Sequence, residues 1–543
     1  MTSPADPVTP MAGLPVGPKP VPRRFHQARW DEPIIFELSV PGARGILPPA
    51  TDPAISAVVG DPAAALPPGI RRERPPALPE LSQVHVVRHF DRLSQETLGA
   101  DLNVDVGEGT CTMKYSPKVN DRLARNPRIA DLHPLQDPGT VQGILEIMWR
   151  LERMLAEISG LDRVTLQPAS GSAAIWANVS MIRAWHASRG EGFDAPGGGR
   201  DEVITTIFSH PSNAACAKVA GYRLITLHPD ENGDPDLGAL RAAVSERTAA
   251  LLITNPEDTG IFNPRIEEFV RVVHEAGGLA SYDQANANGI LGITRAGDAG
   301  FDLCHFNLHK TFSTPHGGGG PGAAACCVTA ALARFLPRPT VERVGDRYVL
   351  DDDRPDSIGK VRPWYGVAPN LVRAYAWIMS LGADGLREVA ETAVLNNNYL
   401  LAKVLEIRGV SAPYAAGRRR IEQVRYSWEK LTRETGLTTD DLGRRVVDFG
   451  THYWTSHHPF VVPEPMTLEP TESYSRSDLD EYAAILARVS AEAYADPEHV
   501  RSAPHASTIH QIDVAPLDDP AAWAITWRAY RRKHSGSDAG PAV

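Results

Sequence analysis

Cysteine is scarce in this chain, with five residues among 543, and no two of them are spaced as Cys-x-x-Cys. So few cysteines, odd in number, indicate neither a disulfide framework nor a structural zinc site. The remaining composition is ordinary, with 42% hydrophobic and 22% charged residues, which excludes a wholly disordered chain. We therefore expect a globular protein of a reducing compartment, the cytoplasm.

Long hydrophobic runs and an excess of positive charge are also missing. The sequence has no run of about 18 apolar residues, the length that spans a bilayer, and its N-terminal stretch has no uninterrupted apolar segment. Acidic residues outnumber basic ones by 66 to 55, giving a net charge of −11. Because phosphate binding needs clustered Lys and Arg, we expect no nucleic-acid partner and no membrane. The basic run RRR at residues 418–420 is expected on a solvated face.

Proline is abundant instead and divides the chain. It crowds residues 1–80, in PPATDP, ALPPG and RERPPALPE, which is typical of an extended arm. A second proline-containing segment, RFLPRPTV, marks a candidate domain boundary, and the region after it has the patterns of long helices. We predict an N-terminal arm over 1–80, a large α/β domain over 81–336, a smaller C-terminal α+β domain over 337–515 and a tail over 516–543.

Short apolar runs alternate with helical patterns through the middle of the chain. In the helix that begins at Ile266, apolar side chains recur at Phe269, Val270 and Val273, and Gly277 stands where the helix should end. Strands that alternate with helices predict a mainly parallel sheet covered by helices on both faces. Ligands of such sheets collect at the carboxyl ends of the strands. The expected strands are RVTLQP, EVITTIFS, RLITL, AALLIT, LASYD and FDLCHF.

Lys310 stands at one of these strand ends, in the stretch NLHKTFSTPHGGGGPG. A lysine that emerges from a buried strand has a lowered amine pKa, which favours Schiff-base chemistry. Asp283 closes the neighbouring strand LASYD, and Ser170, Gly171 and Ser172 open a helix after a third strand. These features together match what pyridoxal phosphate requires. Its aldehyde needs an amine, its pyridinium nitrogen needs a carboxylate, and its phosphate suits a helix N-terminus.

Each of these features also has a simpler structural explanation. Asp283 could cap the following turn, Ser170 could be an ordinary N-cap, and the glycine run at residues 317–320 could be a flexible loop. The glycine run is not a P-loop, because the GK[ST] ending is missing. The histidines around the lysine and in THYWTSHH lack carboxylate or cysteine neighbours at ligand spacing, so no metal site is predicted.

Several long stretches resemble one enzyme family. They are NLHKTFSTPHGGGGPG, LSQETLGADLNVDVGEGTCTMKYSPKVN, HEAGGLASYDQANANGILG, and EPTES followed by SAPH. They are similar to the P-protein of the glycine cleavage system, in the form that makes subunit 2 of a two-subunit enzyme. That family has the pyridoxal-phosphate fold type I. The resemblance, which runs from about residue 32 to residue 514, implies a glycine dehydrogenase (decarboxylating). Such an enzyme releases CO2 from glycine and transfers the aminomethyl group to the lipoyl group of H-protein.

The resemblance also implies roles for single residues. Lys310 would bind the aldehyde of the cofactor covalently, Asp283 would keep its ring nitrogen protonated, and His210 of SHPSNAAC would stack on its ring. Asn255 and Asn286 would lie near its phenolic oxygen. The residues implied around its phosphate are Ser170, Gly171, Ser172 and His309.

The resemblance implies partners as well: a P-protein subunit 1 in an α2β2 assembly or else a homodimer, lipoylated H-protein, and glycine or another small amino acid. Some stretches depart from the family pattern, with DVGEGTCTMK for YPLGSCTMK, SGSAAIW for AGAHGE and YDQAN for YDGAN. Two alternatives therefore stay open. One is a paralogue acting on another small amino acid without a lipoyl protein, and the other is a non-catalytic subunit that completes a partner's site. The presence of Lys310 and Asp283 counts against the second.

Overall fold

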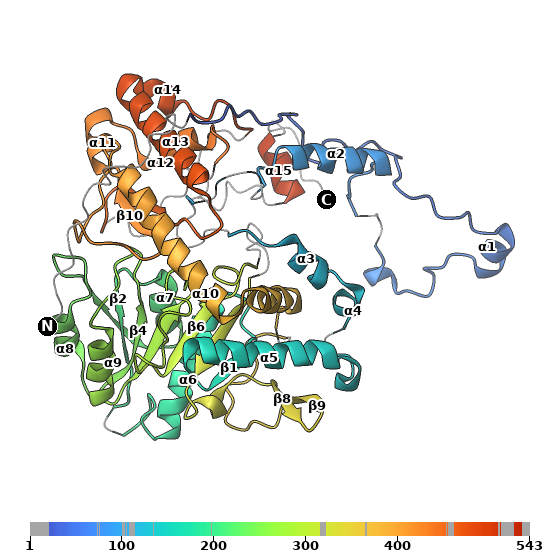
Figure 1. The fold of residues 1–543 in the computed structure, drawn as a ribbon. Helices are drawn as coiled ribbons and strands as arrows, with labels where there is room; N and C mark the ends of the chain where they lie inside the picture. The colour runs from blue at the N-terminus through green and yellow to red at the C-terminus, as the bar shows by residue number, and fades with distance from the viewer. Residues whose placement is uncertain are drawn as a thin grey trace. The chain divides into compact units, whose positions relative to one another are not determined.

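The computed structural model forms two compact units, Met1–Arg24 with Ala100–Ala503 and Phe25–Gly99 with Pro504–Val543. Figure 1 shows the chain from end to end. The described residues are 21–508, 511 and 526–534, except 73, 75, 100–101, 103, 105, 108–113, 134, 197, 315–321, 364–365, 452, 454–460 and 509–510. Within this described part, no helix combines the length and apolarity needed to cross a membrane.

A seven-stranded sheet forms the centre of the first unit. Its strands are β1 (Arg163–Thr165), β2 (Glu202–Thr206), β3 (Arg223–Leu227), β4 (Thr248–Thr254), β5 (Leu279–Gln284), β6 (Leu303–Asn307) and β7 (Ala324–Val328). They lie in the order β1-β7-β6-β5-β4-β2-β3. Strands β2 to β6 pair in parallel, and β7 pairs antiparallel with both β6 and β1. The predicted mainly parallel sheet is confirmed.

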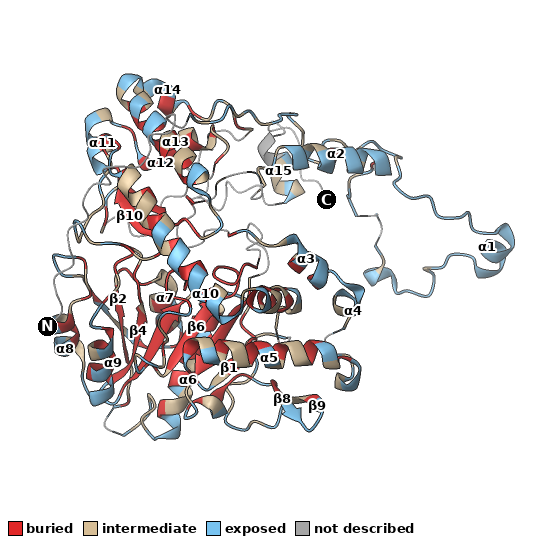
Figure 2. Ribbon diagram, in the orientation of Figure 1, coloured by how far each residue is buried: buried red, intermediate tan, exposed pale blue. Residues whose placement is uncertain are grey.

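Helices cover both faces of this sheet, and Figure 2 shows strands that are buried while the helices carry one buried side. On β4, Leu251 and Ile253 pack into one hydrophobic cluster, whereas Ala250 and Leu252 pack into another. The period of two residues places successive side chains on opposite faces. The first face is covered by α5 (Gln142–Ser159), α8 (Leu237–Ala243), α9 (Ile266–Glu275) and α10 (Ala368–Val404), the second by α6 (Gly171–Ser188) and α7 (Pro211–Val219).

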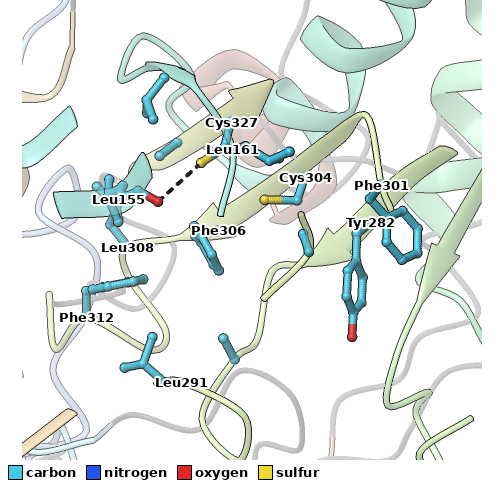
Figure 3. Packing of buried hydrophobic residues seen from close by; sticks show 14 of the residues in the cluster. Leu155, Leu161, Tyr282, Leu291, Phe301, Cys304, Phe306, Leu308, Phe312 and Cys327 are labelled. Atoms are coloured by element: carbon cyan, nitrogen blue, oxygen red, sulfur yellow. Dashed lines mark hydrogen bonds between the residues drawn. The ribbon is translucent and has the colours of Figure 1, made fainter. Parts of the chain in front are cut away.

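Aromatic side chains fix the strands that lead to Lys310 (Figure 3). Tyr282 of β5 stacks on Phe301 with ring centroids 4.5 Å apart, and Phe306 of β6 meets Phe312 edge to face at 5.7 Å. Buried rings of this size contribute much of the packing free energy of a core. The chain on either side of Lys310 is therefore anchored in the core.

Helix α9 behaves as its pattern predicts. Ile266, Phe269, Val270 and Val273 are all buried against the sheet. The helix ends at Glu275, and Gly277 just beyond it has φ 82°. Glycine takes that left-handed conformation at low cost because it has no Cβ.

The remainder of the first unit packs around a separate hydrophobic cluster in which Tyr426, Trp428 and Tyr482 are fully buried. Helix α10 leads into it after a kink at Gly382. Its elements are β10 (Val424–Ser427), β11 (Pro465–Leu468), α11 (Glu429–Thr435), α12 (Thr439–Val447), α13 (Arg476–Ala495) and α14 (Pro497–Arg501). The shorter elements of the unit are α3 (Lys118–Ala124), α4 (Pro127–Ala130), η3 (Pro138–Thr140), η4 (Ala333–Phe335), β8 (Thr340–Val344) and β9 (Arg347–Asp351).

The second unit contains α1 (Pro53–Val59), η1 (Pro68–Ile70), α2 (Gln83–Gln95) and α15 (Trp527–His534). Within it, the Glu32 carboxylate lies 2.9 Å from His89 Nδ1 and 3.0 Å from Arg92 Nη1. Hydrogen bonds from these two side chains lower the pKa of Glu32. The four-part division predicted from the sequence, with boundaries at residues 80, 336 and 515, stays a prediction.

The expectation of a solvated basic run at residues 418–420 was wrong for Arg420. That residue is only 2% exposed, and its guanidinium donates to the carbonyl of Tyr414. Arg419 is exposed, and the half-exposed Arg418 pairs with Asp234 at 2.6 Å.

Candidate active site

The ends of neighbouring strands form one pocket in the first unit. Lys310, Asp283, His210 and Asn286 all line it. Asp283 belongs to β5, and the other three come from the segments that follow β6, β5 and β2. The parallel pairing brings the carboxyl ends of these strands to one edge of the sheet. The structure thus gathers in one pocket four side chains that the sequence places far apart.

Lys310 lies three residues beyond the end of β6 and is only 6% exposed. Its backbone N–H donates to the carbonyl of Asn307, which closes a tight turn at the strand end. The following Thr311 is also buried, and its hydroxyl accepts from the backbone N–H of Ala287. An amine on such a firmly held turn, facing a pocket, is positioned for a bond to a carbonyl compound.

Asp283 lies at the end of β5 with both carboxylate oxygens engaged. Oδ2 accepts from the side-chain amide of Asn213 at 2.8 Å and from the hydroxyl of Thr254 at 3.2 Å. Oδ1 accepts from the backbone N–H of Ala285 at 3.0 Å and lies 3.3 Å from Nε2 of His305. These contacts fix the carboxylate in the pocket wall.

The surroundings of Asp283 keep it ionised. Burial by itself raises the pKa of a carboxyl group, but the nearby His305 and His210 and the hydrogen bond from Asn213 outweigh it, so the pKa of Asp283 is lowered. Burial in turn lowers the pKa of His305. An ionised carboxylate in a closed site can hold a cationic ring nitrogen opposite it.

His210 precedes α7 and acts as its N-cap. Its Nδ1 accepts from the backbone N–H of Ser212 at 3.1 Å, which fixes the ring beside the pocket that Lys310 lines. Asn213, one turn further on, donates to Asp283. The same helix start therefore positions both the imidazole and the partner of the carboxylate.

The proposed phosphate residues lie at the start of α6. Ser170 is its N-cap, and its hydroxyl accepts from the N–H of Ala173 at 3.1 Å. Ser172 and Ser212 share a hydrogen bond of 2.7 Å, which connects the starts of α6 and α7. A Cβ on Gly171 would lie 2.7 Å from the side-chain amide of Asn307, so the helix can approach the strand end only with glycine here.

His309 is buried beside the same turn. Its Nδ1 lies 2.9 Å from the carbonyl oxygen and 3.1 Å from the backbone nitrogen of Ala323. A Cβ on Gly322 would lie 3.0 Å from the same Nδ1 of His309. The glycine run at 317–320 and His316 lie outside the described residues.

The two asparagines predicted near the cofactor differ in their contacts. Asn255 follows β4, and its Oδ1 accepts from the N–H of Asn263, while its Nδ2 has no partner among the described residues. The side-chain nitrogen of Asn286 donates to Glu469, and its Oδ1 accepts from the N–H of Asn288. The roles expected for both stay predictions.

Other residues of the site were missed by sequence reasoning. Asn213 could have been found, since it follows His210 in a turn at a strand end. Glu422 lines the pocket and Glu469 contacts its wall, but both come from the last third of the chain. From the sequence alone, an acidic residue in a loop next to a strand is expected on the surface. The burial of Glu422 and Glu469 depends on packing between distant segments.

A buried ion pair lies at the wall of the Lys310 pocket. Arg425 of β10 is fully buried and pairs with Asp258, which lines the pocket. Burial lowers the pKa of Arg425 to about 9. Its guanidinium also lies 5.8 Å from the ring centroid of Phe208. Among the residues that the structure describes, no three His, Cys, Asp or Glu side chains are grouped to hold a metal ion.

Comparison with known proteins identifies the family. The chain is 46% identical over 510 residues to a protein of Pyrococcus abyssi named probable glycine dehydrogenase (decarboxylating) subunit 2, covering 93% of this chain and 98% of that protein. The chain belongs to the glycine dehydrogenase (decarboxylating) subunit 2 family. Proteins of the same name from Halalkalibacterium halodurans and Aeropyrum pernix are 43% and 41% identical, with 89% and 94% of this chain covered and 96% and 99% of theirs.

Two family models match parts of the chain: aminotransferase class-V over residues 193–320, and the C-terminal domain of glycine dehydrogenase over residues 389–513. The first range includes Lys310, Asp283 and His210. A solved structure titled glycine decarboxylase (P-protein) of the glycine cleavage system shares the fold. Its TM-score is 0.67 at 21% identity, covering 82% of this chain and all of that one.

Proposed function

We propose that this chain is the pyridoxal-phosphate-binding subunit of a glycine decarboxylase. In the proposed reaction, glycine loses its carboxylate as CO2 and its aminomethyl group passes to the lipoyl group of a lipoylated H-protein. The observation that carries the proposal is the pairing of Lys310 and Asp283 in one pocket, at the ends of adjacent strands. Membership in a family whose members are named for this activity supports it.

The residues present fit pyridoxal phosphate. A buried amine and an ionised carboxylate face one pocket, as an aldehyde and a protonated ring nitrogen require. The Nδ2 of Asn255 is buried without a partner among the described residues and can donate to an oxygen of the cofactor. The start of α6 lies close to Asn307 at the end of β6, where glycine at position 171 allows the close approach. The N–H groups of a helix start suit a phosphate.

Each side chain then has a definite task. When bound, the cofactor supplies an electron sink for the electron pair that the departing carboxylate leaves behind. Lys310 would hold the cofactor covalently, and Asp283, kept ionised by His305 and Asn213, would hold its ring nitrogen protonated. His210, fixed by Ser212, would lie against the ring face. Ser170, Ser172 and His309 would lie around the phosphate.

The proposed partners follow from the same reaction. Relatives carry the name subunit 2, which supports a companion subunit 1 and an α2β2 assembly. A lipoylated H-protein accepts the aminomethyl group, and glycine is the substrate. We propose the cytoplasm as the compartment, because so few cysteines suit a reducing environment.

Isotope exchange tests this proposal. Purified chain, candidate subunit 1 and lipoylated H-protein are incubated with glycine labelled in its carboxyl group, and labelled CO2 is measured. We expect release that depends on all three proteins and on pyridoxal phosphate. Release that is absent with glycine but appears with another small amino acid would contradict glycine as the substrate and favour the paralogue.

A further inference from the structure

Two buried carboxyl groups come from paired segments at the wall of the Lys310 pocket. Glu422 stands two residues before β10, and Glu469 directly follows β11. The antiparallel pairing of Val424 with Leu468 brings these two ends together. Glu422 is 2% exposed and lines the pocket, and Glu469 is fully buried behind it.

The hydrogen bonds of the two carboxyl groups are few. Oε1 of Glu469 accepts from the side-chain nitrogen of Asn286 and from that of Asn288, the latter at 2.7 Å. Among the described residues, Oε2 of Glu469 and Oε2 of Glu422 are buried and have no hydrogen-bond partner. A buried carboxyl oxygen in this state carries a proton or meets a ligand, because an unpaired buried charge is strongly unfavourable.

Burial favours the acid form of both carboxyl groups. Burial raises the pKa of Glu469 to about 7, although Asn286, Asn288 and the cations of Lys310 and Lys114 act against it. Burial, with the charge of Glu469 second, raises the pKa of Glu422 well above its usual range.

Two further ionisable residues act on this region. Burial, with the charge of Glu422 second, raises the pKa of Tyr282, so its phenol stays neutral. Lys114, whose charge lowers the pKa of Glu469, lies 3.0 Å from the carboxylate of Glu472. Two carboxyl groups that interact in this way titrate as a pair rather than singly.

We propose that Glu422 and Glu469 form a carboxyl pair that delivers a proton to the sulfur released when the aminomethyl group is transferred. This inference rests on the proposed function. Glu422 is the donor because it faces the pocket, and Glu469 is the positioning residue that holds it in the acid form.

The transfer consumes one proton, and its atoms balance. The bond between the α-carbon and the carboxylate breaks, CO2 leaves, and the electron pair stays with the carbon. A carbon–sulfur bond forms as the lipoyl disulfide breaks, so the carbon is oxidised and the disulfide reduced by two electrons. The second sulfur leaves as a thiolate and takes the proton of Glu422. The pair regains a proton from water when the product leaves.

Amide variants test this step because Gln keeps the shape of Glu but has no proton to release. The variants are Glu422→Gln and Glu469→Gln, and the matched control is Glu152→Gln. Glu152 is also buried, with a pKa raised to about 8 by burial, but it lies on α5 outside the pocket. Glu422→Asp keeps an acid at the position.

Single-turnover kinetics provides the first measurement. We expect thiol formation on the lipoyl group to fall about 10²- to 10⁴-fold in Glu422→Gln, the usual contribution of a general acid. The absorbance change on adding glycine should stay as in the wild type. The wild-type rate should fall as pH rises through the titration of the pair, and Glu422→Gln should lose that dependence. Glu422→Asp should regain part of the rate, and Glu152→Gln should keep all of it.

Infrared titration of the cofactor-free protein provides a second measurement that does not depend on turnover. The carboxyl band of Glu422 is isolated by subtracting the Glu422→Gln spectrum in each background. We expect its midpoint to fall in the Glu469→Gln background, because the neighbouring negative charge is gone. It should not move in the Glu152→Gln background.

Two results would overturn the inference. One is a Glu422→Gln variant that forms thiol as fast as Glu152→Gln while the wild type is active. The other is a Glu422 midpoint that does not respond to Glu469→Gln. A wild type that releases no CO2 from glycine with both partners present refutes the proposed function and the delivery step together. The infrared titration then still decides whether the carboxyl pair exists.

Discussion

At the scale of single residues, charge in this site is controlled by burial and by direct partners acting in opposite directions. Asp283 is deeply buried yet ionised, because His305, His210 and Asn213 compensate the loss of water. Glu469 is buried as deeply and has its pKa raised to about 7. Both carboxyl groups have partners that favour ionisation, but only the partners of Asp283 outweigh the effect of burial.

Replacing Asp283 with Asn should separate cofactor binding from catalysis. The cofactor should still attach to Lys310, and CO2 exchange from glycine should fall by about 10²- to 10³-fold, as when one preorganised electrostatic partner is lost. Absorbance and exchange are measured on the same sample. Asp302→Asn is the control, because Asp302 holds the N–H of Ala280 away from the pocket. Equal exchange in the two variants would refute the role of Asp283.

Glu152 should make stability depend on pH. Its pKa is raised from 4.5 to about 8, so the native state binds more protons than the unfolded state between these values. Stability contributed by the neutral acid is complete at low pH and is lost as pH rises toward 8, with a total of roughly 5 kcal/mol. Urea unfolding at pH 5 and pH 8 measures it. Glu152→Gln should lose less stability than the wild type over this interval, and an equal loss would count against the shift.

At the scale of elements, the strand ends of the sheet determine where chemistry is possible. Lys310 and Asp283 were predicted from strand ends, because a buried parallel strand is visible as a short apolar run. His210 was predicted only from the resemblance to the P-protein family. The partners contributed by β10 and β11 were not predicted, since Arg425, Glu422 and their neighbours reach the site only through long-range packing. Burial of charged residues is a property of the fold and leaves no local pattern.

The turn at Gly277, just after the end of α9, allows a test of how this helix end is stabilised. Gly277→Ala should destabilise the protein twice over, through the left-handed backbone (φ 82°) and through a clash with the Arg200 guanidinium, which donates to the carbonyls of Thr248 and Ala276. Gly190→Ala is the control, because Gly190 has φ 74° but nothing lies near its Cβ position. We expect about 1–2 kcal/mol from the backbone in both variants.

The clash at Arg200 should then make Gly277→Ala the less stable of the two variants. Urea denaturation curves for both variants and the wild type measure the difference. Equal midpoints in the two variants would show that Arg200 is not fixed against this turn.

At the scale of the whole molecule, the hydrophobic clusters that stabilise the fold also position the residues of the site. Clusters on the two faces of the sheet fix the strands, and the separate cluster around Trp428 fixes the β10–β11 ribbon whose ends approach the Lys310 pocket. The sheet and its helices follow from local patterns in the sequence. The ribbon was predicted only as part of a smaller α+β region, because its register depends on contacts across some forty residues.

The central claim is that Lys310 binds pyridoxal phosphate and that the bound cofactor reacts with glycine. The most direct measurement is the visible absorbance of the purified chain with pyridoxal phosphate and subunit 1, before and after glycine is added. Lys310→Ala is compared with Lys218→Ala, an exposed lysine of α7. We expect a covalent cofactor band that glycine shifts in the wild type and in Lys218→Ala, and that is lost in Lys310→Ala. A band that survives in Lys310→Ala, or that ignores glycine in the wild type, would contradict the claim.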